Sequence, residues 1–334
     1  MKIGLLYTVQ AISPTGGVKI QAEMWNKGFK ELEHKSELLS NWKSYDWESY
    51  DALIVFGFGG SFRLMVKDLY NHNRNIAVAP IIDPRVPKWI YKFLVRYWGS
   101  QKYLGLSSRF HNLYLGSKYA KIFFTRSKQE TEYLHYSCNI DYNRIFQIPL
   151  SVRFQPLKEM PQKENFCFHC SRLEAENKNV PRLIEAAKKY KFQLVLAGFL
   201  YGEKGHKWLH DQIDGYENIK YIGTVSNEEL LDWYRKAKVF ALPSLIEGVG
   251  MVALEAAGYG AEIVLTKVGA PKDYYDGQAE LVDPKSIDSI GLGIMKCLEN
   301  GKSQPKLMNY IEKNYSIRSC SIKIIEALKK MKEL

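Results

Sequence analysis

Two glutamates stand eight residues apart in PSLIEGVGMVALEAAGYG, residues 243–260. Glu247 lies in a glycine-rich part that favours a turn, and Glu255 lies in an alanine-rich part that favours a helix. Because glycine has no side chain, the backbone N–H groups of the turn and of the helix start can approach a phosphate closely. The residues that would present these groups are Gly248, Val249, Gly250 and Met251.

The two carboxylates then need partners other than phosphate, since like charges repel. A carboxylate on the second helical turn can accept two hydrogen bonds from neighbouring hydroxyls, as a ribose offers them. Glu247 projects from the turn toward whatever lies beyond the phosphates. The stretch therefore indicates a sugar-nucleotide site, in which the turn holds the diphosphate, Glu255 faces the ribose and Glu247 faces the sugar.

Two further stretches could contribute to such a site. In SRLEAENKNVPRLIEA, Arg172 and Lys178 precede an expected helix, and two cations beside a helix start suit a diphosphate. Solvated surface charge is the alternative, because most isolated cations are no more than that. Near the N-terminus, Gly16 and Gly17 precede another expected helix and let the backbone approach a ligand. A turn that needs a positive φ would explain the same two glycines.

Short apolar runs alternate with longer amphipathic ones along the chain, which predicts an α/β protein with parallel sheets covered by helices. Parallel sheets bind ligands at the carboxyl ends of their strands, where the candidate residues stand. A polar stretch with two prolines separates two such series, so we expect a domain at 1–152, a linker at 153–164 and a domain at 165–305. The expected strands are 2–9, 51–57, 75–82, 121–127, 144–150, 166–171, 192–198, 219–225, 238–244 and 261–266.

The length of 334 residues, 46% of them hydrophobic, is sufficient for two cores. No apolar stretch reaches the length of a membrane-spanning helix, and the first residues are typical of a strand rather than of a signal peptide. Five cysteines without a paired spacing indicate a reducing compartment. We therefore expect a cytoplasmic protein.

The net charge of +11 is concentrated in the first half of the chain. Residues 1–160 hold 22 lysines and arginines against 13 acidic residues, whereas residues 161–334 hold 25 against 23. Within the first half, residues 84–129 contain ten basic residues and no carboxylate, together with many aromatic residues. Such a surface attracts an anionic partner, which could be lipid headgroups, a phosphorylated acceptor or nucleic acid.

We expect this basic segment to attach the protein reversibly to the cytoplasmic face of an anionic membrane. On a helix from about Pro87, the apolar residues Ile90, Phe93, Leu94 and Tyr97 would share one face, beside a row made by Lys88, Lys92 and Arg96. The alternative is that this apolar face packs on the domain core and the lysines are merely solvated.

Taken together, these motifs resemble glycosyltransferase family 4, a family of retaining enzymes with the GT-B fold. Its E-x7-E element matches Glu247 and Glu255, and its upstream Arg…Lys element matches Arg172 and Lys178. The resemblance extends over about 165–285 through LVLAG, IKYIGTVSNEELLDWYRKAKVFALPS and YYDGQAELVDP, and it is weaker over 1–150. It implies two Rossmann-like domains that face a cleft, and a terminal helix within 306–334 that packs back on the first domain.

The resemblance also implies a role for each matching residue. Arg172 and Lys178 would hold the diphosphate and stabilise the charge that builds up on it as it leaves, and Glu247 would contact the donor sugar. The acceptor would attack from the leaving-group face and give its proton to a phosphate oxygen, so that no general base is needed. The other contacts to the nucleotide would come from Glu255 at the ribose, Val225 at the base, and Gly16 and Gly17 at the phosphates.

Three places depart from the family pattern. In the first domain Asp83 stands near the position of a common catalytic histidine, and His111 is a candidate to replace it, but we assign the role to neither. In the second domain two changes predict an unusual donor-sugar pocket, at Gly260-Ala261-Glu262 and at Lys272 and Asp273.

Metal chemistry has little support in the sequence. Cys167 and Cys170 form a C-x-x-C pair, but no second pair has the spacing of a zinc site, and the motif falls in an expected buried strand. No D-x-D occurs, which argues against a metal-bound nucleotide. We expect no metal and no cofactor, with a nucleoside-diphosphate sugar as donor substrate.

The sequence thus predicts a retaining hexosyltransferase that moves a sugar from a nucleoside-diphosphate sugar to a glycan or a lipid-linked acceptor. A sugar-nucleotide epimerase or a phosphorylase-like enzyme would keep the fold and change the reaction, although an epimerase needs additional acid and base residues. A non-catalytic protein that binds nucleic acid or a membrane would explain the basic segment but not the diphosphate residues. Nucleic acid is not an expected partner.

Overall fold

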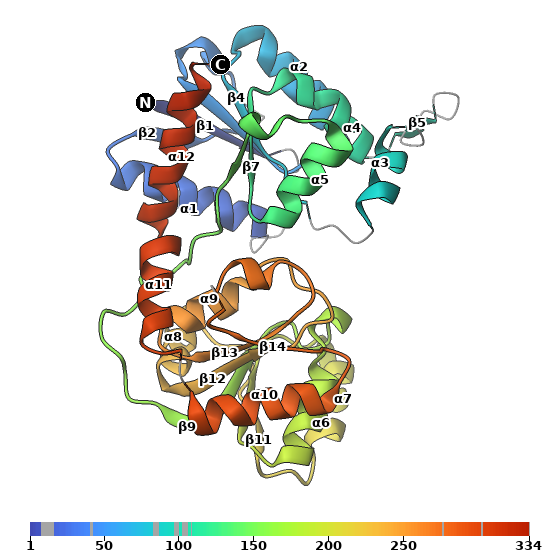
Figure 1. Ribbon diagram of the computed structural model, residues 1–334, viewed down its shortest axis with the longest axis vertical. Coiled ribbons are helices and arrows are strands. Elements are labelled where there is room, and N and C mark those ends of the chain that lie inside the picture. The colour runs from blue at the N-terminus through green and yellow to red at the C-terminus, as the bar shows by residue number, and fades with distance from the viewer. Residues whose placement is uncertain are drawn as a thin grey trace. The chain divides into compact units, whose positions relative to one another are not determined.

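The computed structural model describes residues 1–7, 17–40, 43–82, 87–96, 100–101, 106–107, 109–275, 277–301 and 303–333. The chain forms two α/β units (Figure 1). Unit 1 consists of Met1–Ser151 and Ile317–Leu334, and unit 2 consists of Val152–Ser316. Each unit contains one six-stranded parallel sheet.

The sheet of unit 1 has the strand order β2-β1-β3-β4-β7-β8. Its central strands are completely buried runs of apolar residues, as parallel strands covered on both faces require. The strands are β1 (Lys2–Tyr7), β2 (Lys35–Leu38), β3 (Ala52–Phe56), β4 (Ile76–Ala79), β7 (Ile122–Thr125) and β8 (Ile145–Gln147). A separate antiparallel pair is formed by β5 (Ser100–Gln101) and β6 (Leu106–Ser107).

Helices cover both faces of this sheet (Figure 1). On one face lie α1 (Gly17–Glu31) and α12 (Ile317–Met331), which approach closely because Gly28 has no side chain. A Cβ atom there would lie 2.0 Å from Ser321 Oγ. The other face carries α2 (Phe62–His72), α3 (Lys88–Arg96), α4 (Arg109–Gly116) and α5 (Lys128–Cys138).

Helix α3 packs on unit 1 with the face that carries Tyr91 and Val95, and not with the predicted apolar face, whose packing on the core was the alternative to a membrane contact. Tyr91 and Val95 are buried in the core, whereas Trp89 is 65% and Phe93 is 47% exposed. Tyr97, another residue of the expected apolar face, lies outside the described residues. The core of unit 1 therefore takes the Tyr91 side of the helix, and aromatic side chains stay on the surface.

The sheet of unit 2 has the strand order β11-β10-β9-β12-β13-β14, and all neighbours are parallel. The strands are β9 (Glu164–Cys170), β10 (Leu194–Ala197), β11 (Ile219–Tyr221), β12 (Ala237–Leu242), β13 (Glu262–Thr266) and β14 (Glu280–Val282). The helices are α6 (Val180–Tyr190), α7 (Gly202–Ile213), α8 (Asn227–Lys236), α9 (Met251–Gly258), α10 (Ile287–Asn300) and α11 (Lys306–Tyr315).

The ten strands expected from the sequence are all present, and the α/β class is confirmed. Four strands of the described residues had no expected counterpart: β2 and β14, which each lie at an edge of a six-stranded sheet, and the short pair of β5 and β6. Segment 153–164, expected as a linker, belongs to unit 2, and its last residue, Glu164, is the first residue of β9. Its Leu157 N donates to Gly258 O at 2.9 Å, so it packs on the body of the unit.

The terminal segment 306–334 forms two helices rather than one. The chain is extended at Ser316, where α11 ends, and α12 begins at the next residue. Helix α11 packs in unit 2 and α12 packs in unit 1 against α1. Among the described residues, no helix combines the length and the apolar composition that crossing a bilayer requires.

Candidate functional site

The strand order of unit 2 places the predicted residues at one edge of its sheet. Strand β9 comes first in the chain, and the strands that follow lie on both of its sides, β10 on one and β12 on the other. Ligands of such sheets bind at the carboxyl ends of the strands where the order reverses. The loops after β9 and β12 meet there, because Leu245 N donates to Asn177 O at 2.9 Å and Asn179 Nδ2 donates to Pro243 O at 2.9 Å.

Lys178 and Glu247, predicted separately from the two loops, form an ion pair at this edge. Lys178 Nζ donates to Glu247 Oε2 at 2.8 Å, and Ser244 Oγ donates to the same oxygen at 2.9 Å. The side chains are 22% and 13% exposed, so the pair is largely but not completely covered. An anion can therefore compete for the ammonium group, and a sugar hydroxyl can bond to the carboxylate.

The backbone of Glu247 is held by the loop that follows β13. Glu247 N donates to Val268 O at 3.4 Å, and Ala270 N donates to Glu247 O at 3.3 Å. Gly269, between these partners, has a φ of +104°, and a Cβ atom there would lie 2.0 Å from Glu247 O. Glycine is therefore required at 269 for the carboxylate of Glu247 to keep its place.

The phosphate turn predicted from the sequence begins helix α9 as expected. Gly250 has a left-handed backbone with a φ of +74°, and its carbonyl accepts the first helical hydrogen bonds, from Ala253 N and Leu254 N. Val249 is buried, whereas Gly248 and Met251 are partly exposed. The first-turn N–H groups of α9 thus start beside the Lys178–Glu247 pair, where the chain can offer them to an anion.

Arg172 and Val225 also lie at this edge of the sheet. Arg172 follows β9, is exposed, and forms no ion pair with the described residues. Val225 lies after β11 and is half-buried; the next residue, Ser226, caps helix α8 together with Glu229. Strand β10 lies between β11 and β9. Along the sheet, Val225 is therefore farther from the Lys178–Glu247 pair than Arg172 is.

Glu255 is oriented differently from the expectation. Its side chain is 0% exposed, and Arg153 holds both of its oxygens, with Nε 2.5 Å from Oε1 and Nη2 2.8 Å from Oε2. This bonded carboxylate raises the pKa of the Arg153 guanidinium. Most of α9 is buried, so its second turn packs inside the unit and Glu255 does not face outward as the sequence predicted.

Of the departures from the family pattern, the one at Gly260-Ala261-Glu262 is buried in unit 2. Gly260 has a φ of +84°, and Glu262 is 6% exposed and accepts a hydrogen bond from Ser303 N at 3.0 Å. Lys272 and Asp273 lie in a short 3-10 helix after β13. In unit 1, Gly16 and Asp83 lie outside the described residues, and Gly17 is the first residue of α1. His111 Nδ1 lies 2.7 Å from Val95 O.

The C-x-x-C segment connects two strands. His169, between the cysteines, is fully buried, with Nδ1 2.8 Å from Ala241 O and Nε2 2.7 Å from Ser171 Oγ. Burial lowers the pKa of His169 to about 4. Over the described ranges, no three His, Cys, Asp or Glu side chains are arranged to hold a metal ion. The segment therefore serves the packing of β9 against β12.

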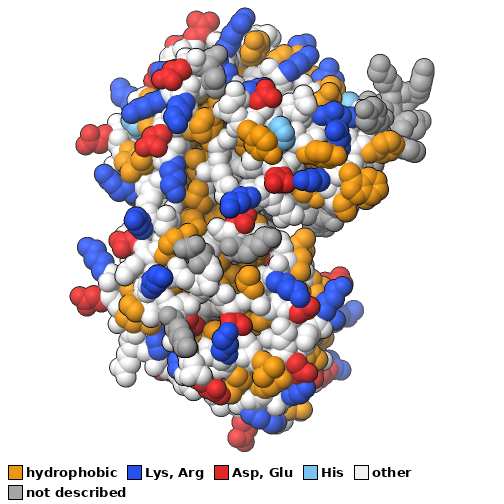
Figure 2. All heavy atoms as spheres, viewed as in Figure 1, with side chains coloured by type: hydrophobic (Ala, Val, Ile, Leu, Met, Phe, Trp, Pro, Cys, Tyr) orange, Lys and Arg blue, Asp and Glu red, His pale blue; other side chains and the backbone are white. Residues whose placement is uncertain are grey.

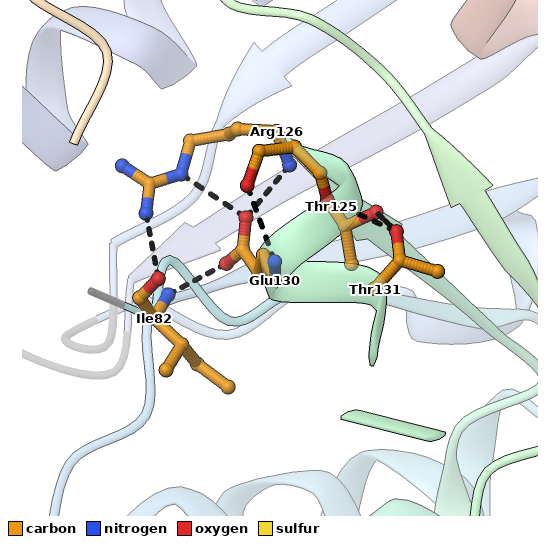
Figure 3. Close-up of polar contacts among 6 residues, drawn as sticks. Ile82, Thr125, Arg126, Glu130 and Thr131 are labelled. Carbon is orange, nitrogen blue, oxygen red and sulfur yellow. Dashed lines mark hydrogen bonds and ion pairs between the residues drawn. The ribbon is translucent and has the colours of Figure 1, made fainter. Parts of the chain in front are cut away.

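In unit 1 a buried carboxylate that sequence reasoning missed joins the carboxyl ends of β4 and β7 (Figure 3). Glu130 is 1% exposed and accepts from Ile82 N at 2.6 Å and from Arg126 N at 2.7 Å. Arg126 also donates to Ile82 O at 3.1 Å, so it spans the two strands. The chain is thereby fixed at the residue before Asp83. The available sequence signal was Ser127-x-x-Glu130, because Ser127 caps α5 by accepting from Glu130 N.

A comparison with protein families gives a match within unit 2. Residues 154–315 match the family model described as "Glycosyl transferases group 1". Among curated proteins, O-antigen chain mannosyltransferase B of Escherichia coli is 28% identical over 130 residues, which are 37% of this chain and 34% of that protein. Sucrose-phosphate synthase of Spinacia oleracea is 33% identical over 133 residues, 34% of this chain and 13% of that protein. The matches thus span about a third or less of these relatives.

Solved structures resemble the chain over both units. A sucrose-phosphate synthase from Thermosynechococcus elongatus aligns with a TM-score of 0.73 at 13% identity and covers 100% of both chains. The Anabaena protein HepE in complex with UDP aligns with a TM-score of 0.72 at 16% identity, over 99% of this chain and 100% of that one. These similarities show that the chain has the GT-B type of fold, with two Rossmann-like units.

Proposed function

We propose that this chain, whose residues 154–315 match the model of the group 1 glycosyltransferases, moves a sugar from a nucleoside-diphosphate sugar to a glycan or lipid-linked acceptor, with retention at the anomeric carbon and without a metal. The chain would act as a hexosyltransferase of family 4. The HepE structure supports a nucleoside-diphosphate sugar as donor, since that structurally similar protein was solved in complex with UDP.

One observation carries this proposal most directly: the Lys178–Glu247 pair at the carboxyl ends of β9 and β12. Two loops, far apart in the sequence, bring a cation and a carboxylate within 2.8 Å at the point where the strand order reverses. Helix α9 begins at Met251, four residues after Glu247. A cation and free N–H groups suit a diphosphate, and an adjacent carboxylate suits the hydroxyls of the attached sugar.

In the proposed reaction the diphosphate leaves with its bonding electrons, and negative charge builds up on its oxygens. Lys178, Arg172 and the N–H groups of the first turn of α9 stabilise that charge. The acceptor hydroxyl attacks the anomeric carbon from the same face, and its proton passes to a departing phosphate oxygen. Glu247 holds the sugar by hydrogen bonds to its hydroxyls.

The proposed ribose contact to Glu255 needs a change at Arg153. Both carboxylate oxygens already bind the guanidinium, and the Glu255 side chain is fully covered. A ribose can reach Glu255 only when Arg153 gives up at least part of this contact. We therefore assign Arg153 to the ribose end of the proposed site.

We also propose that the acceptor is met at a membrane. Trp89 and Phe93 of α3 are exposed, and Lys88 and Lys92 stand next to them in the same helix. The ammonium groups of the two lysines lie 5.7 Å and 4.4 Å from the ring centre of Tyr136, which is also exposed. Figure 2 shows hydrophobic and basic side chains next to each other over α3 and α5. Exposed aromatic residues beside lysines suit the interface of an anionic bilayer.

A screen of nucleotide sugars tests the proposal. The full chain is incubated with UDP-, GDP-, ADP- and dTDP-sugars in the presence of EDTA, and the release of nucleoside diphosphate is followed. We expect slow hydrolysis of at least one donor, with a product that first carries the anomeric configuration of the donor. Glu247→Gln should abolish this hydrolysis, and Glu217→Gln, at an exposed carboxylate of the same unit, should not. Conversion to an epimeric sugar nucleotide, or activity only with Mg²⁺ or Mn²⁺, would contradict the proposal.

A further inference from the structure

A concave region of unit 1 lies at the amino ends of strands of its sheet, opposite to the carboxyl ends of β4 and β7 that Glu130 joins. Its cavity has a volume of about 420 Å³ and is lined by Tyr70, Arg74, Lys118, Tyr119, Ala120, Lys121, Asn143 and Arg144. Lys121 directly precedes β7, Arg144 directly precedes β8, and Arg74 stands two residues before β4. These three strands are parallel neighbours, so their amino ends bring the three cations together. We call this region the strand-start pocket.

The pocket contains four cations and no carboxylate among its lining residues. Two of the cations have structural partners. Arg144 donates through Nε to Lys121 O at 2.9 Å and through Nη2 to Ser117 O and Ala120 O, and Lys121 Nζ donates to Met331 O at 3.3 Å. Burial lowers the pKa of Arg144, and the charge of Asp141 opposes this effect only in part.

The other two cations are held by aromatic rings. Arg74 stands over the ring of Tyr70 at 4.9 Å, and Lys118 stands over the ring of Tyr119 at 5.0 Å. The two rings lie 5.5 Å apart. Both cations are exposed, and neither forms an ion pair with a described residue. Ring contacts place a cation without neutralising it, so the positive charge stays available to a ligand.

From this arrangement we propose that the strand-start pocket binds a phosphate-bearing ligand through Arg74 and Lys118, with Lys121 and Arg144 at its base. Guanidinium and ammonium groups that converge without a carboxylate are the usual partners of phosphate oxygens. The cavity is larger than a phosphate ion and leaves room for the organic part of a phosphate ester. The ligand can be a soluble phosphate ester or the headgroup of an anionic lipid, because both present the same oxygens.

This site is separate from the proposed donor site, since it belongs to unit 1 and the Lys178–Glu247 pair belongs to unit 2. It also lies at the amino ends of the strands, whereas ligands of doubly wound sheets bind at the carboxyl ends. The inference therefore goes beyond the proposed function and does not depend on it.

Phosphate binding to the full chain tests the inference. Inorganic phosphate is titrated at constant ionic strength and followed by calorimetry, with a saturating nucleoside diphosphate present to occupy a donor site. The test variant is Arg74→Gln/Lys118→Gln, which leaves Arg144 and its backbone contacts intact. The matched control is Lys27→Gln/Lys30→Gln, which removes two exposed charges from α1, on the other face of the same sheet.

We expect the test variant to bind phosphate roughly tenfold or more weakly than the natural chain, as the loss of charge-assisted hydrogen bonds implies. The control variant should bind like the natural chain, and the test variant should keep its affinity for the nucleoside diphosphate. Equal phosphate affinity in the test variant and the natural chain, or no phosphate binding at all, would overturn the inference.

A second arm identifies the source of the phosphate. Sedimentation with phosphatidylcholine vesicles that contain phosphatidic acid is compared between the natural chain and the test variant. A loss of vesicle binding in the test variant, together with weaker phosphate binding, identifies a lipid headgroup. Unchanged vesicle binding together with weaker phosphate binding identifies a soluble phosphate ester. Both results support the pocket, because both require Arg74 and Lys118.

Discussion

At the scale of single residues, the contact between Arg153 and Glu255 changes how the E-x7-E motif is understood here. A buried carboxylate is costly unless it is paired, and the guanidinium of Arg153 supplies the pairing with two parallel hydrogen bonds. Glu255 therefore has a structural role in unit 2 in addition to the proposed ribose contact. The two roles predict different results when either partner is removed.

Replacement of Arg153 should mainly affect stability. Arg153→Met leaves Glu255 buried without a counter-charge, so we expect the free energy of unfolding to fall by roughly 3–5 kcal/mol. Urea unfolding followed by circular dichroism measures this change. The matched control is Arg235→Met, whose ion pair with Asp232 is exposed at 42% and 62% and should contribute less than about 1 kcal/mol. Equal losses in the two variants would mean that the buried pair does not form in solution.

The sequence could not predict Arg153 because its segment has no periodic pattern. Residues 153–164 carry charges and two prolines, which are typical of a linker, and only the fold shows that Arg153 packs against α9. Lys178 and Glu247 could be predicted, since each follows an expected strand and strand ends of one parallel sheet meet at one edge. The 2.8 Å distance between them could not, because it depends on how the two loops bend.

At the scale of elements, the central strands and the edge strands β8 and β11 could be predicted, whereas the edge strands β2 and β14 could not. A strand buried on both faces has a continuous apolar sequence, as β3 and β4 do. Strand β2 alternates between exposed and partly buried residues over four positions, and β14 has three residues, so neither has a distinctive pattern. Helix α3 was expected, but its buried face depends on Tyr91 and Val95 rather than on Phe93.

Helix α3 is the element on which the proposed membrane contact depends. We expect Trp89→Ser/Phe93→Ser to bind anionic vesicles roughly tenfold or more weakly than the natural chain, because each exposed aromatic side chain would lose its apolar contact with the bilayer. Vesicle sedimentation at increasing fractions of anionic lipid measures the effect, and added salt should weaken binding of the natural chain.

The matched control for this variant is Leu64→Ser, which removes a side chain of α2 that is 63% exposed and should leave vesicle binding unchanged. If the natural chain binds neutral and anionic vesicles equally, or if the α3 variant binds like the natural chain, the membrane contact is not made by α3.

At the scale of the whole molecule, the two units differ in charge and in the support for their roles. The excess of positive charge lies in residues 1–160, and the family match lies in residues 154–315. We infer a division of labour in which unit 2 holds the donor and unit 1 meets the anionic surroundings of the acceptor. The C-terminal helix α12 is part of unit 1, so unit 1 combines two segments from distant parts of the chain, whereas unit 2 is one continuous segment.

The proposed reaction depends on the stabilisation of a leaving diphosphate by Arg172 and Lys178, and the turnover of charge-neutral variants is its sharpest test. Hydrolysis of the accepted nucleotide sugar is measured for the natural chain, for Arg172→Gln, for Lys178→Gln and for the control Lys236→Gln, which removes an exposed cation from the last turn of α8, at the amino end of β12 in the same unit. We predict that kcat falls more than ~10²-fold in each of the first two variants, as the loss of transition-state charge stabilisation requires. The control should stay within about twofold of the natural chain, since an exposed charge far from the reaction contributes little. Turnover near that of the natural chain in Arg172→Gln and Lys178→Gln would contradict the account.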